Sequence, residues 1–274
     1  MKCMVTKGCI NYEISGSGYP VLILHSMGTD YRSMKAWLEP VFNDIEGFQR
    51  IYIDIPAHGK SLIDDYFASS DDMLVNILDF IDRIIPNQEF SLIGFSYGGY
   101  LAQGILHQRR SLVKSICLLA TALHLKEKRI LPEKVIQDQD TVALMGLDSD
   151  IRIAFETLMN IQNKENLEIF LREIQPGRLL ANRNFLLSNW REKGYYFSEE
   201  PLQDADMVSL PALLILGKQD SICGYKDHFN LFEKFSHATF AVLDQAGHML
   251  HIEKREIVQG LIKDWLTRSN SISK

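Results

Sequence analysis

One stretch, Gly94-Phe95-Ser96-Tyr97-Gly98-Gly99, constrains the fold more than any other part of this sequence. Residues 89–93 before it form a short apolar run typical of a buried strand, and residues 100–106 after it are typical of a helix. A serine on a sharp turn between a strand and a helix is held in a strained conformation, and neighbouring glycines remove side-chain collisions. We therefore predict that Ser96 stands clear of a sheet, with the first amides of a helix directed toward whatever it attacks.

The composition restricts what else the chain can be. Of its 274 residues, 46% are hydrophobic and 23% are charged, which fits one large α/β domain or a domain with an insertion. The net charge of −6 argues against a nucleic-acid partner, because phosphate neutralisation requires clustered Lys and Arg. No apolar run reaches membrane-spanning length, and the first residues lack the apolar core of a signal peptide, so we expect a cytoplasmic protein without a membrane partner.

The cysteines and the common ligand motifs indicate no cofactor. Four cysteines are present, and none forms a C-x-x-C pair: Cys3, Cys9, Cys117 and Cys223. We interpret them as reduced structural thiols, with a disulfide between Cys3 and Cys9, across a predicted hairpin, as the alternative. Neither H-E-x-x-H nor a G-x-G-x-x-G that opens a helix occurs, so we expect no metal and no organic cofactor.

Predicted strands and helices alternate along most of the chain. The strands cover residues 2–6, 9–15, 21–24, 49–54, 89–93, 113–119, 212–217 and 238–243. Helical periodicity falls at residues 34–45, 70–81, 100–106, 226–235 and 257–266. The last helix is expected to bury Ile257 and Val258, and residues 269–274 are expected to fray. This alternation predicts a mostly parallel sheet flanked by helices, with right-handed crossovers.

The alternation breaks after Thr121. Residues 122–208 are polar and helical in pattern, and a stretch of this length between two strands is too long for a loop. Its amphipathic or apolar stretches are residues 151–158, 167–174 and 181–190. We predict a core made of residues 1–121 and 209–274, with a helical cap of residues 122–208 seated over the strand ends where Ser96 is exposed.

Three candidate catalytic side chains each follow a predicted strand, namely Ser96, Asp220 and His248. Parallel strands would bring them to one edge of the sheet. A serine hydroxyl needs an adjacent base at neutral pH, and that base needs an acid to fix its tautomer. We predict His248 as the base and Asp220 as the acid, with Asp244, which is near His248 in the sequence, as the rival acid.

Two further loops carry recognisable patterns. The strand at residues 21–24 ends in His25-Ser26-Met27-Gly28, and the strand at residues 49–54 leads into Asp54-Ile55-Pro56-Ala57-His58-Gly59-Lys60-Ser61. Together with the serine turn and the order serine, aspartate, histidine, these motifs resemble the α/β-hydrolase family over nearly the whole chain. The resemblance is to the serine-nucleophile branch with a helical cap, and it implies an α/β-hydrolase fold.

The resemblance also implies where a negatively charged oxygen would be held. By this comparison the backbone N–H groups of Met27 and Tyr97 form an oxyanion hole. Ser26 stands where the family usually has glycine, which affects the path of this loop. Three polar loop residues are interpreted as structural rather than catalytic: His25, Asp54 and His58.

The predicted function is hydrolysis of a small-molecule ester, thioester or lactone through an acyl-enzyme on Ser96. The expected partner is a small-molecule acyl substrate, and the sequence leaves a homodimer open. Pocket candidates from the cap and the loops are Phe155, Phe185, Trp190 and Met249, although core packing explains an apolar residue on a helix at least as well.

Two alternative functions remain open. One is a carbon–carbon bond hydrolase of the 2-hydroxy-6-oxo-dienoate type, because residues 182–187 are similar to a segment of those enzymes. Arg178 or Arg183 could then bind a substrate carboxylate, or could simply be surface charge. Against this alternative, Met249 stands where those enzymes usually have an aromatic residue. The other is a ligand-binding or signalling protein on the same fold with little turnover.

Overall fold

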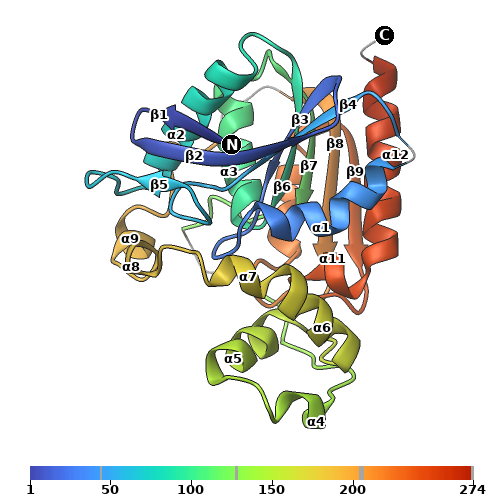
Figure 1. The fold of residues 1–274 in the computed structure, drawn as a ribbon. Helices are drawn as coiled ribbons and strands as arrows, with labels where there is room; N and C mark the ends of the chain where they lie inside the picture. Colours follow the sequence, from blue (N-terminus) through green and yellow to red (C-terminus); the bar gives the residue numbers. More distant parts are fainter. Residues whose placement is uncertain (44, 127–128, 204–206, 273–274) are drawn as a thin grey trace.

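A computed structural model describes residues 1–43, 45–126, 129–203 and 207–272, and its strands form one nine-stranded sheet (Figure 1). The strands are β1 (Lys2–Val5), β2 (Gly8–Ser15), β3 (Tyr19–Leu24), β4 (Phe48–Ile53), β5 (Leu62–Ile63), β6 (Phe90–Phe95), β7 (Val113–Leu119), β8 (Val208–Gly217) and β9 (Phe235–Leu243). Their order across the sheet is β1-β2-β4-β3-β6-β7-β8-β9, with β5 paired to β2. From β4 to β9 the neighbours are parallel, and β2 is antiparallel to β1 and β4, so the predicted mostly parallel sheet is confirmed.

Helices cover both faces of the sheet (Figure 1). On one face, α1 (Tyr31–Phe42) packs against α12 (Arg255–Ile272), which follows the short helix α11 (Leu250–Glu253). On the other face, α2 (Ser70–Ile84) packs against α3 (Tyr97–Gln108). A capping box starts α2: the Ser69 hydroxyl accepts from the Asp72 N–H, and the Asp72 carboxylate accepts from the Ser69 N–H.

Strand β3 shows why the central strands are apolar throughout. Val21 and Ile23 belong to the hydrophobic cluster that contains the buried residues of α1 and α12. Leu22 and Leu24 belong to the cluster that contains the buried residues of α2 and α3. Because successive side chains of a strand point to opposite faces, a strand covered on both sides needs apolar residues at every position.

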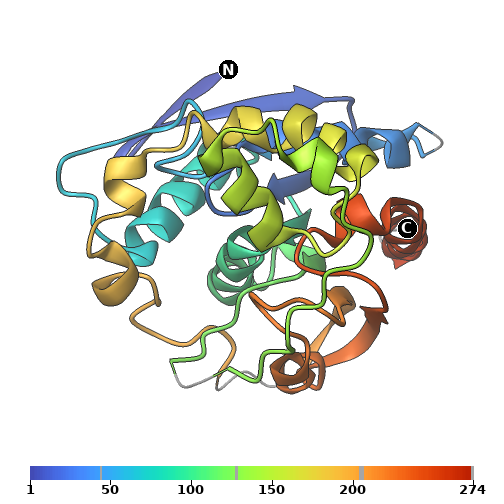
Figure 2. The ribbon, with the colours of Figure 1, turned by 90° about the horizontal axis from the view of Figure 1, so that it is seen from below.

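The segment between β7 and β8 carries a series of short helices. They are α4 (Thr141–Leu144), α5 (Ser149–Leu158), α6 (Lys164–Glu173), α7 (Gln175–Arg178), α8 (Arg183–Leu186) and α9 (Trp190–Lys193). They lie beyond one end of the parallel strands (Figure 1 and Figure 2), where α6 contacts α1 and α11. The exact division into a core and a cap of residues 122–208 stays a prediction, and its last residue, Val208, already pairs in β8.

Three predicted helices differ from the structure. The helix expected at 226–235 is a 3-10 turn (Lys226–His228) followed by the one-turn helix α10 (Phe229–Phe232), because β9 already begins at Phe235 to pair with Val208. Residues 181–190 form the separate turns α8 and the start of α9 instead of one helix.

In the last helix, Ile257 is 52% exposed while its neighbour Val258 is fully buried, so Ile257 lies off the apolar face. The helix also continues through Ser269, whose hydroxyl donates to the Trp265 carbonyl, and it ends at Ile272. Residues 273–274 of the expected tail lie outside the described residues. Among the helices described, none combines the length and the hydropathy that crossing a bilayer requires.

Candidate active site

Ser96 lies on the turn between β6 and α3 with a φ of 54° and a ψ of −116°. Few non-glycine residues adopt a positive φ, so the surrounding backbone must hold it there. Its N–H donates to the Leu119 carbonyl at 2.8 Å. A Cβ at Gly94 would lie 2.6 Å from the Gly98 carbonyl oxygen, and one at Gly98 would lie 2.4 Å from the His25 carbonyl oxygen. The predicted collisions at both glycines are confirmed.

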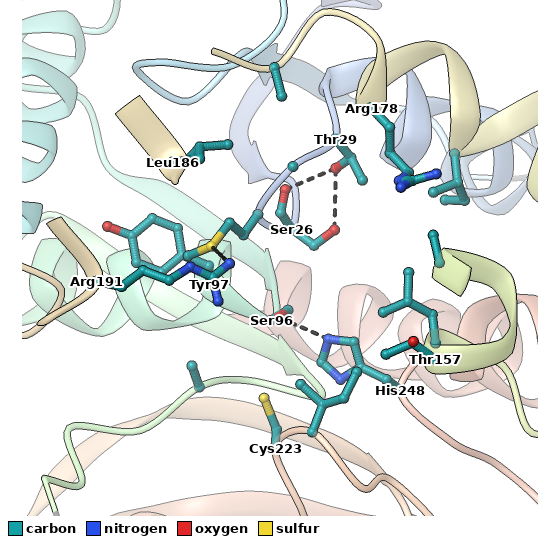
Figure 3. A pocket seen from close by; sticks show the side chains of 18 of the residues that line it. Ser26, Thr29, Ser96, Tyr97, Thr157, Arg178, Leu186, Arg191, Cys223 and His248 are labelled. Atoms are coloured by element: carbon teal, nitrogen blue, oxygen red, sulfur yellow. Dashed lines mark hydrogen bonds between the residues drawn. The ribbon is translucent and has the colours of Figure 1, made fainter. Parts of the chain in front are cut away.

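The structure brings the three predicted catalytic side chains together, and Figure 3 shows the bond between Ser96 and His248. The Ser96 hydroxyl lies 2.9 Å from His248 Nε2, and His248 Nδ1 lies 2.9 Å from Asp220 Oδ2. The second oxygen of Asp220 accepts from the N–H groups of Ile222 and Cys223 at 2.8 and 3.0 Å. With both oxygens engaged, Asp220 fixes the imidazole so that Nδ1 donates and Nε2 accepts from the serine.

Burial and charge act in opposite directions on this pair. Burial raises the pKa of Asp220, but the positive charge and hydrogen bond of His248, with two backbone amides, lower it further than burial raises it. Burial lowers the pKa of His248, but the Asp220 carboxylate and the adjacent Cys223 thiol raise it above its ordinary value. The Asp220 carboxylate therefore stabilises the imidazolium that forms when His248 accepts the proton of Ser96.

The rival acid lies elsewhere. Asp244 is on the surface, where it accepts from the Gln219 side chain at 3.0 Å and faces the Lys218 ammonium at 3.5 Å. Neither contact joins Asp244 to His248. The geometry thus joins the imidazole to Asp220 and leaves Asp244 in a turn at the end of β9.

The polar loop residues interpreted as structural do brace the backbone. His25 is fully buried, and its Nε2 accepts from the Ile55 N–H at 2.9 Å while its Nδ1 donates to the Ser26 carbonyl at 2.7 Å. Asp54 accepts from the backbone N–H groups of Tyr31 and Lys60 at 2.9 and 2.8 Å. His58 is fully buried, and its Nδ1 donates to the Pro56 carbonyl at 2.9 Å. These bonds tie the loops after β3 and β4 to each other.

The loop that follows β3 lies beside Ser96. Within it the Thr29 N–H donates to the Ser26 carbonyl at 3.3 Å, and the two hydroxyls of Ser26 and Thr29 lie 3.2 Å apart. Ser26 is thus accommodated by a partner within its own loop. Met27 and Tyr97 both line the cavity at Ser96, and their backbone N–H groups have no acceptor among the residues that the structure describes. Their role as an oxyanion hole stays a prediction.

A cavity of about 820 Å³ opens at the serine. Ser96, His248 and the loop after β3 form its floor, and residues of α5, α7, α8 and α9 form its opposite wall. Its volume lies in the range of small-molecule sites, roughly 300–1,000 Å³. The space between the strand ends and the helical segment is therefore large enough for a small substrate.

Of the four predicted pocket residues, Met249 lines this cavity and the other three do not. Phe155 is fully buried and packs edge-to-face on Phe170 at 5.4 Å, within the contact between the helical segment and the core. The Phe185 and Trp190 rings pack on each other at 5.2 Å, and the Trp190 ring lies 5.8 Å from that of Tyr97. The sequence predicted these aromatic residues to line the pocket because helical spacing indicates which face of a helix is apolar. It does not indicate what that face packs against.

Several cavity-lining residues were not identified from the sequence as site residues. Cys223 lies beside His248 (Figure 3), and its closeness to Asp220 in the sequence is the signal that could have found it. Arg129 and Arg191 also line the cavity, and no sequence pattern marks them. Asp220, Cys223 and His248 each offer a metal-ligand atom within 4.8 Å of the others. A metal ion there would break the Asp220–His248 hydrogen bond, so we assign no metal to the group.

An open parallel sheet with a serine on the turn after β6 and helices inserted between β7 and β8 defines an α/β hydrolase. Residues 20–255 match the family model described as Hydrolase_4, serine aminopeptidase S33, and the chain belongs to this family. It is similar to an alpha/beta superfamily hydrolase from Oenococcus oeni, with a TM-score of 0.87, 24% identity, and coverage of 98% of this chain and 99% of the other. The predicted α/β-hydrolase fold is therefore confirmed.

Two curated relatives cover most of the chain. A monoacylglycerol lipase, ABHD6, from Homo sapiens is 24% identical over 90% of this chain and 74% of its own length. A 2-hydroxy-6-oxo-6-(2'-aminophenyl)hexa-2,4-dienoic acid hydrolase from Metapseudomonas resinovorans is 20% identical over 96% of this chain and 89% of its own length. These relatives agree that the chain is a hydrolase and differ in substrate.

Proposed function

We propose that the chain is a serine hydrolase that cleaves a small-molecule ester, thioester or lactone through an acyl-enzyme on Ser96. The observation that supports this proposal most is the pair of 2.9 Å hydrogen bonds that links Ser96 to His248 and His248 to Asp220, with Ser96 and His248 lining the cavity. A serine bonded to a neutral imidazole, which is in turn bonded to a buried carboxylate, is the arrangement that acyl transfer requires.

The proposed reaction has two halves. Ser96 Oγ attacks the substrate carbonyl while its proton passes to His248 Nε2, which gives a tetrahedral oxyanion and an imidazolium paired with Asp220. Collapse of this intermediate expels the alcohol, thiol or ring oxygen, which takes the proton from His248. Water then repeats the sequence on the acyl-serine, with His248 as its base, and releases the acid.

The backbone N–H groups of Met27 and Tyr97 are the proposed donors to the oxyanion. Both residues line the cavity on the side of Ser96, and Tyr97 is the first residue of α3. The amide groups at the N-terminal end of a helix carry a partial positive charge, and each oxyanion donor contributes about 3–4 kcal/mol of transition-state stabilisation. This arrangement requires no metal ion and no organic cofactor.

A second candidate is a carbon–carbon bond hydrolase that acts on a dienoate, which the name of the Metapseudomonas resinovorans relative supports. The same serine, histidine and cavity would serve it. The monoacylglycerol lipase relative and Met249, in place of an aromatic residue after His248, favour the ester class. A ligand-binding or signalling protein with little turnover is the third candidate, and it differs from the other two in turning its ligand over very slowly or not at all.

A fluorophosphonate probe and a series of 4-nitrophenyl esters test the proposal. The wild-type protein should label rapidly and release 4-nitrophenol, whereas Ser96→Ala should do neither. Ser236→Ala, which removes an exposed serine on β9, is the control and should behave as wild type. Labelling that persists in Ser96→Ala would contradict the proposal. Turnover of a dienoate but of no ester would favour the second candidate, and labelling without turnover of any acyl substrate would favour the third.

A further inference from the structure

The charge lining the cavity is opposite in sign to that of the whole protein. The chain has a net charge of −6, yet four arginines line the cavity: Arg129, Arg178, Arg183 and Arg191. Asp150 is the one carboxylate among the described lining residues. Because Asp150 forms its ion pair with Arg183, at 3.2 Å, it does not neutralise the other three. Low-dielectric walls concentrate such an excess of positive charge.

Arg178 reaches the cavity from α7, which packs closely on the loop after β3. A Cβ at Gly177 would lie 2.5 Å from the Asp30 nitrogen, so the helix could not sit so close with a larger residue there. The Arg178 guanidinium donates to the Gln175 side chain at 2.6 Å and to the Asp150 carbonyl at 3.4 Å. Within the described part of the chain it has no carboxylate partner. Burial, followed by the nearby charge of Arg183, lowers the pKa of Arg178 by more than the charge of Asp150 raises it.

Arg191, in α9, approaches the same loop from the other side. Its guanidinium donates to the Met27 sulfur at 2.9 Å, and a thioether is a weak acceptor that a carboxylate oxygen would outcompete. No carboxylate among the described residues pairs with it. Figure 3 shows Arg178 and Arg191 on opposite sides of the segment that carries Ser26 and Thr29, with Ser96 below.

We infer that the cavity selects substrates that bear a carboxylate, and that Arg178 and Arg191 are the specificity residues that bind it. The inference rests on the proposed hydrolase function and names its substrate class. A guanidinium donates two parallel N–H groups that match the two oxygens of a carboxylate. The two arginines flank the loop proposed to hold the oxyanion. A substrate carboxylate bound by them would therefore lie near the place where the scissile carbonyl binds.

Matched ester pairs test the inference. Each pair consists of the mono-4-nitrophenyl ester of adipic, pimelic or suberic acid and its counterpart with the free carboxylate capped as a methyl ester. For at least one acid, wild-type kcat/KM should be about 10-fold or more higher for the free carboxylate at low salt, because hydrogen bonds to charged groups give discrimination of this order. The double variant Arg178→Gln with Arg191→Gln should lose that preference, because its kcat/KM should fall much more for the free carboxylates than for the capped esters.

Two further variants separate charge at the site from general effects. The double variant to lysine keeps the charge without the planar fork, and it should retain a reduced preference. Arg152→Gln removes an arginine of α5 that is ion-paired to Glu156 and does not line the cavity, so its preference should equal that of wild type. The inference would be overturned if the wild-type protein preferred the capped ester of every acid. It would also be overturned if the double glutamine variant kept the wild-type preference for the free carboxylate.

A binding measurement keeps the inference testable if the proposed function fails. In the Ser96→Ala protein, calorimetry should detect binding of succinate or adipate at low salt, and that affinity should fall about 10-fold or more in the double glutamine background. Fluorophosphonate labelling of Ser96 reports separately on the hydrolase proposal. Labelling without carboxylate binding or preference would overturn the inference alone, and carboxylate binding without labelling would overturn the hydrolase proposal alone.

Discussion

The floor of the cavity and its helical wall hold their polar side chains in different ways. On the floor, Ser96 and His248 are 8% exposed or less, and Asp220, which is bonded to His248 but does not line the cavity, is fully buried. On the wall, Arg178 and Arg191 are at least partly exposed and donate to a side-chain amide, a carbonyl and a thioether. The difference fits the proposal that residues at the sheet edge carry out the chemistry, whereas arginines of the inserted helices bind the substrate.

The largest expected effect on kcat comes from replacing His248, the proposed catalytic base. His248→Gln should lower kcat by about 10⁶-fold, because the serine loses its proton acceptor while the cavity is kept. His237→Gln replaces an exposed histidine of β9 and should leave kcat unchanged. Steady-state kinetics on the best 4-nitrophenyl ester would measure both. A loss of less than about 100-fold in His248→Gln would contradict its role as the base.

The next comparison is between Asp220, the proposed catalytic acid, and Asp244, the carboxylate on the surface. Asp220→Asn should lower kcat by about 10⁴-fold, since the amide would favour the wrong imidazole tautomer. Asp244→Asn, on the exposed turn, should change kcat by less than about 2-fold, because it removes only weak surface contacts. The same kinetic assay compares them. Equal losses in the two variants would show that the contacts at Asp220 do not decide catalysis.

Glycine substitutions test how tightly the backbone holds the floor. Gly98→Ala places a Cβ 2.4 Å from the His25 carbonyl oxygen and should lower the free energy of unfolding by about 2 kcal/mol or more. Gly260→Ala has no atom within 4 Å of its new Cβ and lies on the exposed side of α12, so it should raise stability by about 0.5–1 kcal/mol. Urea denaturation measures both changes. A Gly98→Ala protein as stable as wild type would mean that the loop after β3 moves freely.

Acid should weaken the loops that support the floor. Burial lowers the pKa of His25 to about 4 and that of His58 to about 3, whereas an unfolded histidine has a pKa of about 6.5. Between the folded and the unfolded pKa values, the unfolded chain binds protons that the folded chain does not. The stabilisation that these neutral histidines contribute is therefore fully present above pH 6.5 and decreases as the pH falls toward 4. Each histidine contributes a slope of up to about 1.4 kcal/mol per pH unit.

Urea denaturation between pH 7.5 and pH 4.5 would measure this dependence. His25→Asn removes one of several buried histidines whose pKa burial lowers, and it should give a shallower slope than wild type, whatever its stability at neutral pH. His237→Asn, at an exposed site, serves as the control and should keep the wild-type slope. Identical slopes in all three proteins would show that His25 takes up a proton as readily in the folded chain as in the unfolded chain, which would contradict the prediction.

The floor of the cavity could be predicted from the sequence because local rules fix it. Gly94 and Gly98 indicate the collisions around Ser96, and the ends of parallel strands indicate where Asp220 and His248 must meet. These features depend on short-range backbone geometry, which a sequence pattern records directly.

The wall could not be predicted in the same way. The apolar pattern identified α5 and α6 as helices, but Phe155 packs inward rather than lining the cavity. The sequence analysis named Arg178 and Arg183 as candidates, and both line the cavity, but the positions of Arg129 and Arg191 depend on how the chain crosses the strand ends, which no local pattern contains. Ile257 shows the same limit in the core, because an apolar residue one position away from the buried stripe is left exposed.

The most direct measurement of the central claim is the mass of the protein during turnover. When a 4-nitrophenyl ester is mixed in and the reaction is quenched within the first turnovers, mass spectrometry should find one acyl group on the peptide that contains Ser96. This group should form as 4-nitrophenol is released and should be absent in Ser96→Ala. Release of 4-nitrophenol at an undiminished rate in Ser96→Ala, or an acyl group carried by another residue, would contradict the account.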